Sequence, residues 1–268
     1  MKASVNKTCL IGPTIVKEQF VVEHLFYYLV SGTLSGFYWD KSYTLQAGEY
    51  GIVRKNRLGR MNNSKDTQVA EKIIFVFDEP FLKTFQAKHH IHPVKFQSAE
   101  GFIQQPDNDL IPGFINSLTP YYNEQGKMDK AFFDVKREEL LLILLQLQPE
   151  LSGVFFDYGI PGKINLEEFM NRNYKFNVSL NRFAYLTGRS LSAFKRDFKT
   201  IFNQTPNRWL IQKRLQEAHF LIEKKNEKAS EIYLDLGFEA LSHFSFAFKK
   251  MFGLTPTELA QQKNKQLL

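Results

Sequence analysis

The sequence predicts an α+β protein in which a strand-rich N-terminal part precedes an all-helical C-terminal part. Between residues 20 and 78, β-branched and aromatic residues form short runs that turn residues interrupt. Between residues 164 and 268, apolar residues recur at helical spacing instead. Within that second region one pattern of sixteen residues occurs twice, which predicts two copies of one structural unit.

The N-terminal strands are expected in four runs, which are VVEHLFYYLVSG, FYWDKSYTL, GEYGIVRKN and EKIIFVFDE. Glycines and the pair Asn62-Asn63 lie between the runs and supply the turns. Several short strands joined by regular turns are typical of an antiparallel barrel or sandwich. A short helix is expected over Phe81–Lys88 and a further strand over Val94–Gln97.

Two helices are expected next. Asp109–Glu124 carries Leu110, Phe114 and Leu118 at positions i, i+4 and i+8, whereas Phe132–Gln148 is almost continuously apolar in its second half. A helix that is apolar around most of its circumference is buried on several sides. Packing against the strands accounts for part of this surface, and a face for self-association into a homodimer accounts for the rest.

Leu151–Lys163 contains three glycines and a proline, which predicts a connection between two domains. The domains are expected at residues 1–163, including the helices within 107–148, and at residues 164–268. The helices of the second domain are expected over Val178–Leu186, Ser190–Phe202, Pro206–Lys225, Ser230–Leu236 and Leu241–Phe252, with a last one from Thr255. Capping boxes are expected at Asn165 with Glu168 and at Thr255 with Glu258, and Thr205 is the expected N-cap before Pro206.

The repeated pattern occupies residues 191–206 and 241–256, and eight of its sixteen positions are identical. Its phenylalanines recur at i, i+4 and i+8, so they lie along one side of a helix and leave the other side polar. A glycine, Gly188 or Gly237, precedes each copy and follows a shorter helix-like segment. Each copy is therefore predicted to be a helix-turn-helix unit.

The positive charge is confined to the second domain. Residues 164–268 hold 17 Lys and Arg against 10 Asp and Glu, and 17 − 10 equals the whole net charge of +7. Basic charge in one segment indicates nucleic acid or an anionic membrane surface as the partner. Two helix-turn-helix units with the same periodicity have no role in binding a membrane surface. No run approaches the roughly 18 apolar residues of a membrane span. We therefore expect double-stranded DNA and no membrane. One cysteine, Cys9, and the lack of a leader pattern predict a cytoplasmic protein.

The segment IYLDLGFEALSHFSFAFKKMFGLTP at 232–256, the copy before it, and RLQEAHFLI at 214–222 resemble the AraC/XylS family of bacterial transcription regulators. The resemblance implies two helix-turn-helix lobes bridged by one long helix, with each recognition helix in its own segment of the major groove. It also implies an N-terminal cupin-like β half-barrel that senses a signal, and RNA polymerase as a partner. The expected bridging helix, Pro206–Lys225, has 20 residues and spans about 30 Å, close to the roughly 34 Å between successive major-groove segments.

In the first recognition helix, Leu191, Phe194 and Phe198 are expected to face the core of the lobe. The opposite face presents the first candidates for DNA contact, which are Ser192, Lys195, Arg196 and Lys199. By family position the first three of these resemble base-reading residues, and Arg and Lys favour the O6 and N7 atoms of guanine. Lys199 is better placed for phosphate. Arg208, at the start of the bridging helix, is a further candidate for DNA contact.

In the second recognition helix the candidates for DNA contact are Ser242, His243, Ser245, Phe246 and Lys249. This helix departs from the family pattern, which often has Arg where Phe246 stands. Phe246 either touches a thymine methyl group or packs within the lobe. The first lobe is therefore expected to supply most of the base specificity, and the second lobe mainly to position the protein.

Candidate ligand-binding residues in the N-terminal domain are His24, Tyr28, Trp39 and Arg54, of which Arg54 suits an anionic ligand. The alternative is that the aromatic residues belong to the core and Arg54 to the surface. The signal that controls the N-terminal domain is expected to be a small-molecule effector or a protein regulator. The segments FYYLVSG and AGEYGIV resemble the branch of the family that controls type III secretion, in which the partner is a protein.

Neither a metal site nor a cofactor is expected. His89, His90 and His92 lack the glycine-flanked His-x-His pattern with a following Glu that metal cupins use. No nucleophile with an adjacent base, phosphate-binding glycine loop or paired-carboxylate motif is recognisable either, so the sequence predicts no enzyme. A metal-cupin enzyme fused to a DNA-binding domain is the disfavoured alternative.

Overall fold

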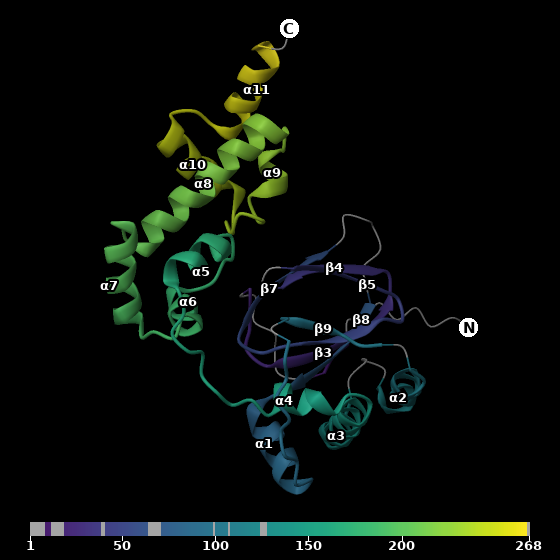
Figure 1. The fold of residues 1–268 in the computed structure, drawn as a ribbon. Coiled ribbons are helices and arrows are strands. Elements are labelled where there is room, and N and C mark those ends of the chain that lie inside the picture. The colour runs from purple at the N-terminus through teal and green to yellow at the C-terminus, as the bar shows by residue number, and fades with distance from the viewer. Residues whose placement is uncertain are drawn as a thin grey trace, which may run out of the picture. The chain divides into compact units, whose positions relative to one another are not determined.

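The computed structural model of this 268-residue chain describes residues 9–11, 19–38, 41–63, 71–98, 100–106, 108–123 and 128–266. The chain divides into two compact units, residues 1–159 and residues 160–268 (Figure 1). The described strands all lie in the first unit and the second is helical, which confirms the predicted α+β class.

Two sheets build the N-terminal unit. The first has the order β1-β8-β3-β6-β9, formed by Cys9–Ile11, Glu71–Phe77, His24–Ser31, Tyr50–Val53 and Phe102–Gln104. The second has the order β2-β7-β4-β5, formed by Phe20–Val21, Arg57–Asn63, Thr33–Tyr38 and Lys41–Gln46. The paired strands are antiparallel except for β1 and β8, which are parallel.

The first sheet is buried on both faces. On one face Phe26 of β3 and Phe75 of β8 pack into a core shared with helices, and on the other Leu25 and Ile74 pack against the second sheet. The helices are α1 (Glu79–Lys88), α2 (Leu110–Ser117), α3 (Lys130–Leu147) and α4 (Ser152–Phe155), which Figure 1 shows together along one side of the strands. Because both faces are covered, β3 and β8 read as nearly continuous apolar runs.

Helix α3 is buried along one side by its own unit, and apolar residues on its other sides are exposed in the single chain. Leu140, Leu141 and Leu144 are fully buried, while Val135 is 64% exposed and Leu142 43% exposed. The predicted second helix, Asp109–Glu124, is shorter than expected, since α2 ends at Ser117 and a 3₁₀ turn (η1, Thr119–Tyr121) follows.

The first half of the expected interdomain connection is wrong. Leu151 ends a 3₁₀ turn (η2, Pro149–Leu151), and α4 follows directly and buries Val154 and Phe155 in the core. Gly153, one of the three glycines in the predicted connection, is needed for packing because a Cβ there would meet the carbonyl oxygen of Val94.

The expected strand at Val94–Gln97 is also wrong. The amide of Val94 donates to Ser152 Oγ at 3.1 Å rather than to a neighbouring strand. The strand that completes the first sheet is β9 at Phe102–Gln104, which pairs with β6.

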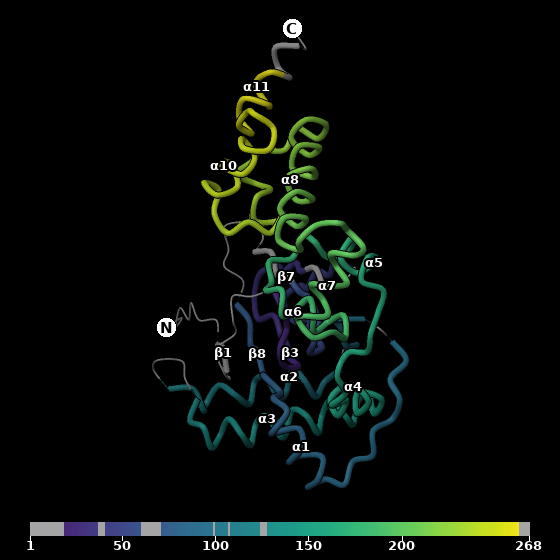
Figure 2. The backbone as a smooth tube through the Cα atoms, turned by 90° about the vertical axis from the view of Figure 1, so that its left-hand side faces the viewer, coloured from purple at the N-terminus to yellow at the C-terminus, as the bar shows by residue number. Residues whose placement is uncertain are grey.

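The C-terminal unit consists of two small lobes joined by a long helix. Its helices are α5 (Leu166–Asn173), α6 (Leu180–Leu186), α7 (Leu191–Phe202), α8 (Pro206–Lys225), α9 (Ala229–Ile232), α10 (Leu241–Phe252) and α11 (Pro256–Gln266). We call α5–α7 the first lobe and α9–α11 the second lobe. Figure 2 shows α10 and α11 beside the C-terminal half of α8, with α7 near its N-terminal end. Helix α9 is shorter than the predicted Ser230–Leu236, because residues 233–237 form a turn.

Side-chain caps fix several of these helix starts. Asn165 accepts a hydrogen bond from the amide of Glu168, and Thr255 and Glu258 cap each other reciprocally, as predicted. Thr205 precedes α8 but makes no side-chain cap bond, so the start of α8 depends on Pro206 at its first position.

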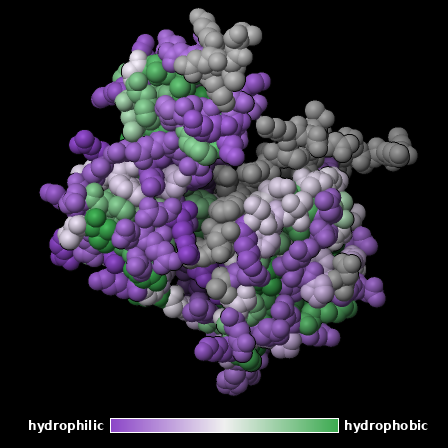
Figure 3. Space-filling model, turned by 45° about the horizontal axis from the view of Figure 1, so that its top comes forward, coloured by the Kyte–Doolittle hydropathy of each residue, from purple (hydrophilic) through white to green (hydrophobic). Residues whose placement is uncertain are grey.

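On the face that Figure 3 shows, hydrophilic residues dominate and hydrophobic residues form small groups among them. No helix in the described part of the chain is both long and apolar enough to cross a membrane.

Candidate nucleic-acid interface

Helix α7 has one aromatic face and one polar face, as its periodicity predicts. Phe194 and Phe198 are fully buried, and Phe198 and Phe202 pack against Trp209 of α8 with ring centroids 5.5 and 4.6 Å away. Leu191 is only half-buried, contrary to its expected core position. The exposed side chains include every candidate predicted on this helix, which are Ser192, Lys195, Arg196 and Lys199.

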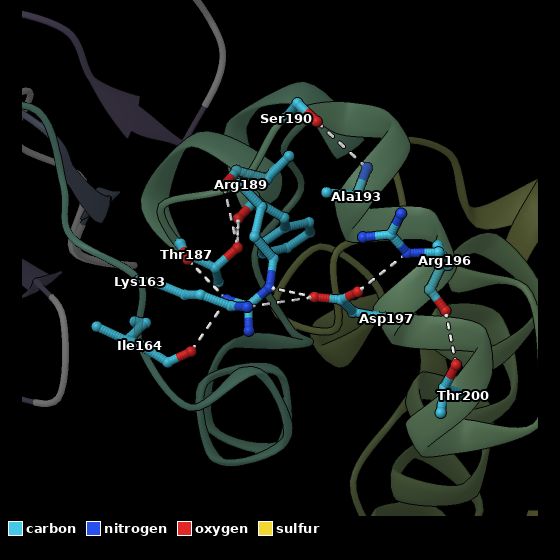
Figure 4. Close-up of polar contacts among 11 residues, drawn as sticks. Lys163, Ile164, Thr187, Arg189, Ser190, Ala193, Arg196, Asp197 and Thr200 are labelled. Atoms are coloured by element: carbon cyan, nitrogen blue, oxygen red, sulfur yellow. Dashed lines mark hydrogen bonds and ion pairs between the residues drawn. The ribbon is translucent and has the colours of Figure 1, made fainter.

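Arg196 belongs to a network of charged side chains on and beside α7 (Figure 4). The Arg196 side chain is 78% exposed, and its Nε lies 3.5 Å from Asp197 Oδ1. Asp197 Oδ2 accepts a hydrogen bond from Arg189 Nε at 3.1 Å, and this bond is the main cause that lowers the pKa of Asp197. Arg189 in turn donates to the carbonyl oxygens of Ile164 and Thr187. Asp197 is therefore an anion held in place by Arg189. It restricts the conformation of the Arg196 side chain, whose guanidinium remains exposed to solvent.

Helix α10 repeats the architecture with different surface chemistry. Phe244 and Phe248 are fully buried, and Phe248 stacks with His219 of α8 at 6.1 Å. The predicted candidates Ser242, His243, Phe246 and Lys249 are exposed and Ser245 is half-buried. Phe246 is 70% exposed, so the alternative in which it packs within the lobe is wrong.

Helix α8 gives each lobe a separate set of core residues. Trp209 belongs to the first lobe, whereas Leu215, Ala218 and Ile222 belong to the hydrophobic core of the second. Arg208 lies on the exposed side near the start of α8. One rigid element of 20 residues, about 30 Å long, therefore carries both recognition helices.

Three residues with structural roles at this interface were not identified from the sequence. They are Arg189 and Asp197, which hold Arg196, and Arg214, whose buried guanidinium binds backbone carbonyls of both lobes. Arg189 and Asp197 lie 8 residues apart, and Arg214 bonds a carbonyl 40 residues away, so no local pattern marks these contacts. The one available signal was the position of Arg214 within an otherwise apolar stripe of α8.

The N-terminal candidates are engaged in the fold. His24 is buried, its Nδ1 accepts from the amide of Lys55 at 3.2 Å, and its Nε2 has no hydrogen-bond partner in the described part of the chain. Tyr28 stacks on Tyr50 at 6.2 Å, and Arg54 donates to the carbonyl oxygens of Ser98 and Glu100. Trp39 lies outside the described residues.

The burial of His24 predicts acid sensitivity of the N-terminal unit. Burial, and then the charges of Lys55, Arg54 and Arg57, lower its pKa well below 6.5. Below pH 6.5 the unfolded chain takes up a proton at His24 that the folded chain does not. The free energy of unfolding therefore decreases as the pH is lowered, by up to about 1.4 kcal/mol per pH unit. Urea unfolding at pH 7.5 and 5.5 measures this.

The control for that prediction separates His24 from other groups. His24→Asn keeps an acceptor for the Lys55 amide and removes the titration, so it should flatten the pH dependence. His92→Asn, at an exposed position, should leave it unchanged. An equal pH dependence in His24→Asn and in the unaltered chain would contradict the assignment.

The three neighbouring histidines do not converge. His89 Nε2 lies 2.8 Å from Glu138 Oε1, and His90 and His92 are exposed. Within the described ranges, no group of three or more His, Cys, Asp or Glu residues is placed to hold a metal ion.

Comparison with known proteins covers both units. Residues 24–153 match the family model described as the ExsA N-terminal regulatory domain, and residues 183–262 match a helix-turn-helix domain model. The virulence regulon transcriptional activator VirF of Yersinia enterocolitica is 25% identical over 89% of this chain and 90% of its own length. The thermoregulatory protein LcrF of Yersinia pestis is 25% identical over the same shares. The HTH-type transcriptional regulator ExsA of Pseudomonas aeruginosa is 23% identical over 89% of this chain and 86% of its own. These matches agree with the paired helix-turn-helix lobes on α8, and the chain belongs to the AraC/XylS family of transcriptional regulators.

Proposed function

We propose that this DNA-binding transcription regulator is an activator that reads an asymmetric site with α7 and α10 in successive major-groove segments. The observation that carries the proposal is the pairing of two helices, each with a buried phenylalanine pair and an exposed polar face, on one helix of 20 residues. A span of about 30 Å suits major-groove segments about 34 Å apart on one face of the duplex.

The two helices read DNA unequally. On α7, Lys195 and Arg196 are donors for guanine O6 and N7, and Arg196 is restricted by Asp197. On α10, Ser245 and Phe246 occupy the corresponding positions, and the exposed ring of Phe246 suits contact with a thymine methyl group. Lys199, Arg208 and Lys249 are assigned to phosphate, because exposed cations beside a reading face position the protein without selecting bases.

The N-terminal unit receives the controlling signal. We assign this signal to a protein partner in preference to a metabolite, because side chains fill both faces of the first sheet. The exposed apolar residues of α3, among them Phe132, Val135 and Leu142, support self-association of this unit. The regulator acts in the cytoplasm by positioning RNA polymerase at the promoter, and it has no catalytic step of its own.

A comparison of two variants tests the unequal reading. The full chain is used to select duplexes from a random-sequence pool, and affinities for the selected and scrambled duplexes are then measured. Arg196→Ala should lower the preference for the selected duplex by roughly 5- to 150-fold, because one bidentate contact is worth about 1–3 kcal/mol. Phe246→Ala should lower this preference less, and only at the base positions that α10 contacts, which we call the second block; the bases that α7 contacts form the first block.

The thermal stability of both variants should stay close to that of the unaltered chain, because both side chains are mostly exposed. An equal loss of preference in Arg196→Ala and Phe246→Ala would contradict the unequal reading.

A further inference from the structure

One side chain joins the two lobes directly. Arg214 lies in the middle of α8 and is 8% exposed. Its Nε donates to the carbonyl oxygen of Tyr174 at 2.7 Å and its Nη2 to that of Phe176 at 2.8 Å. Its Nη1 donates to the carbonyl oxygen of Gly237 at 2.9 Å. The first two carbonyls follow α5 in the first lobe, and the third lies in the helix-turn-helix turn of the second.

The partners of Arg214 are backbone carbonyls at fixed positions. Burial lowers the pKa of Arg214 to about 10, so the side chain remains a cation at neutral pH. A planar guanidinium presents its donors in a rigid fork, so three such bonds fix the directions of the groups that they join. The single ammonium of a lysine cannot reproduce that fork.

The backbones of the two lobes also lie in contact here. Gly237 has a φ of +79°, and a Cβ on it would lie 2.6 Å from the carbonyl oxygen of Lys175. Two side-chain pairs flank the contact: Asn177 Nδ2 donates to Glu239 Oε1 at 2.9 Å, and Lys175 Nζ lies 2.7 Å from Glu217 Oε1. We call Arg214, its three carbonyl partners and the two flanking pairs the interlobe clasp.

The hydrophobic residues described on the two sides of the clasp form separate groups. The second-lobe core contains residues from Leu215 to Leu259, while the first lobe packs its aromatic residues around Trp209. Between them lies a cavity of about 430 Å³ lined by residues of both lobes, including Leu180, Arg214, Phe238 and His243. The polar contacts of the clasp lie at the edge of this cavity and join the two lobes beside α8.

We propose that the interlobe clasp sets the spacing and rotational phase of α7 relative to α10, and so selects DNA sites by the distance between their two halves. This inference rests on the proposed function. One base pair added between the half-sites moves one half about 3.4 Å along the duplex and turns it by about 35°. Lobes joined by the interlobe clasp cannot shift and rotate to match the displaced half-site. Lobes joined by α8 alone can change their relative orientation.

The test measures tolerance to spacing with the full chain and a duplex recovered by selection from a random-sequence pool. Versions of this duplex with one base pair added or removed between the two blocks are compared with the original. The unaltered chain should bind them about tenfold or more weakly, because one lobe loses its base contacts. In Arg214→Lys the penalty should shrink to within about threefold, while affinity for a duplex holding the first block alone is unchanged.

A second variant keeps the test decisive if Arg214→Lys does not fold. Asn177→Ala combined with Lys175→Met removes both flanking pairs and leaves Arg214 in place, and it should also reduce the spacing penalty. Asn171→Ala, at an exposed position of α5, is the matched control and should keep the full penalty.

A purely stabilising role would weaken binding to all spacings equally, so an unchanged spacing penalty in a folded clasp variant overturns the inference. Failure of the unaltered chain to enrich any sequence from the pool would instead contradict the proposed function. The two failures are therefore distinguishable.

Discussion

Raising the salt concentration from about 50 to about 200 mM is expected to weaken binding of the chain to duplex DNA by roughly 10³–10⁵-fold. The expectation follows from about 6–10 phosphate contacts, each of which releases a condensed counterion. The C-terminal region carries the whole net charge of +7, and its DNA-facing candidates Lys199, Arg208 and Lys249 are exposed. Fluorescence anisotropy of a labelled duplex over a salt series measures the slope of log affinity against log salt.

Single-charge variants locate the source of that slope. Lys199→Ala and Lys249→Ala should each reduce its magnitude by about one, because each removes one phosphate contact. Lys95→Ala removes the same charge from an exposed position in the N-terminal unit and should leave the slope unchanged. A salt response that is flat in the unaltered chain would count against DNA binding through this surface.

Alanine in place of Gly237 is expected to lower the free energy of unfolding of the C-terminal unit by about 2–4 kcal/mol. Two costs add: the left-handed backbone at φ +79°, and a Cβ placed 2.6 Å from the Lys175 carbonyl oxygen and 2.8 Å from Arg214 Cζ. The second cost displaces the guanidinium from its carbonyl partners. Urea unfolding followed by circular dichroism measures the loss.

Gly253 provides the matched control, because it has nearly the same backbone angle, φ +80°, and no atom within 4 Å of the Cβ position. Gly253→Ala should therefore cost only about 1 kcal/mol, the backbone term alone. Gly253→Asn should cost less still, since Asn203 ends α7 at the equivalent position of the repeat with φ +52°. Equal losses for Gly237→Ala and Gly253→Ala would show that the close approach of the lobes has no energetic consequence.

The features that the sequence predicted well are those that depend on local periodicity. The spacing of Phe194 and Phe198, and of Phe244 and Phe248, determines which side of each recognition helix is buried. Most of the other side chains on those helices then follow by rotation, so the exposed candidates on α7 could be identified from the sequence. The bounds of α8 were predictable for a similar reason, because Thr205-Pro206 and the charged end at Lys225 are local signals.

The features that the sequence did not predict depend on contacts between distant residues. Gly153 resembles a linker residue until the carbonyl of Val94 is placed against it. Val94–Gln97 resembles a strand, but the amide of Val94 donates to Ser152 Oγ. Arg214 lies in an apolar stripe of α8, but only the fold brings the carbonyls of Tyr174, Phe176 and Gly237 to it.

Phe246 illustrates the limit of pattern reading within a motif. The repeat places it one position after a half-buried residue and two before Phe248, so periodicity alone left it between the core and the DNA-facing side. Its exposure of 70% places the ring on the outer face, where the side-chain chemistry differs from that of Lys195 and Arg196 on the first copy of the repeat.

The most direct test of the account is the pattern of bases in duplexes that the full chain selects from a random-sequence pool. Two unequal recognition helices on α8 predict two blocks about one helical turn apart, with a guanine-containing block of strong preference and a weaker, thymine-containing one. A single block, two blocks of equal guanine preference, or no enrichment of any sequence would contradict it.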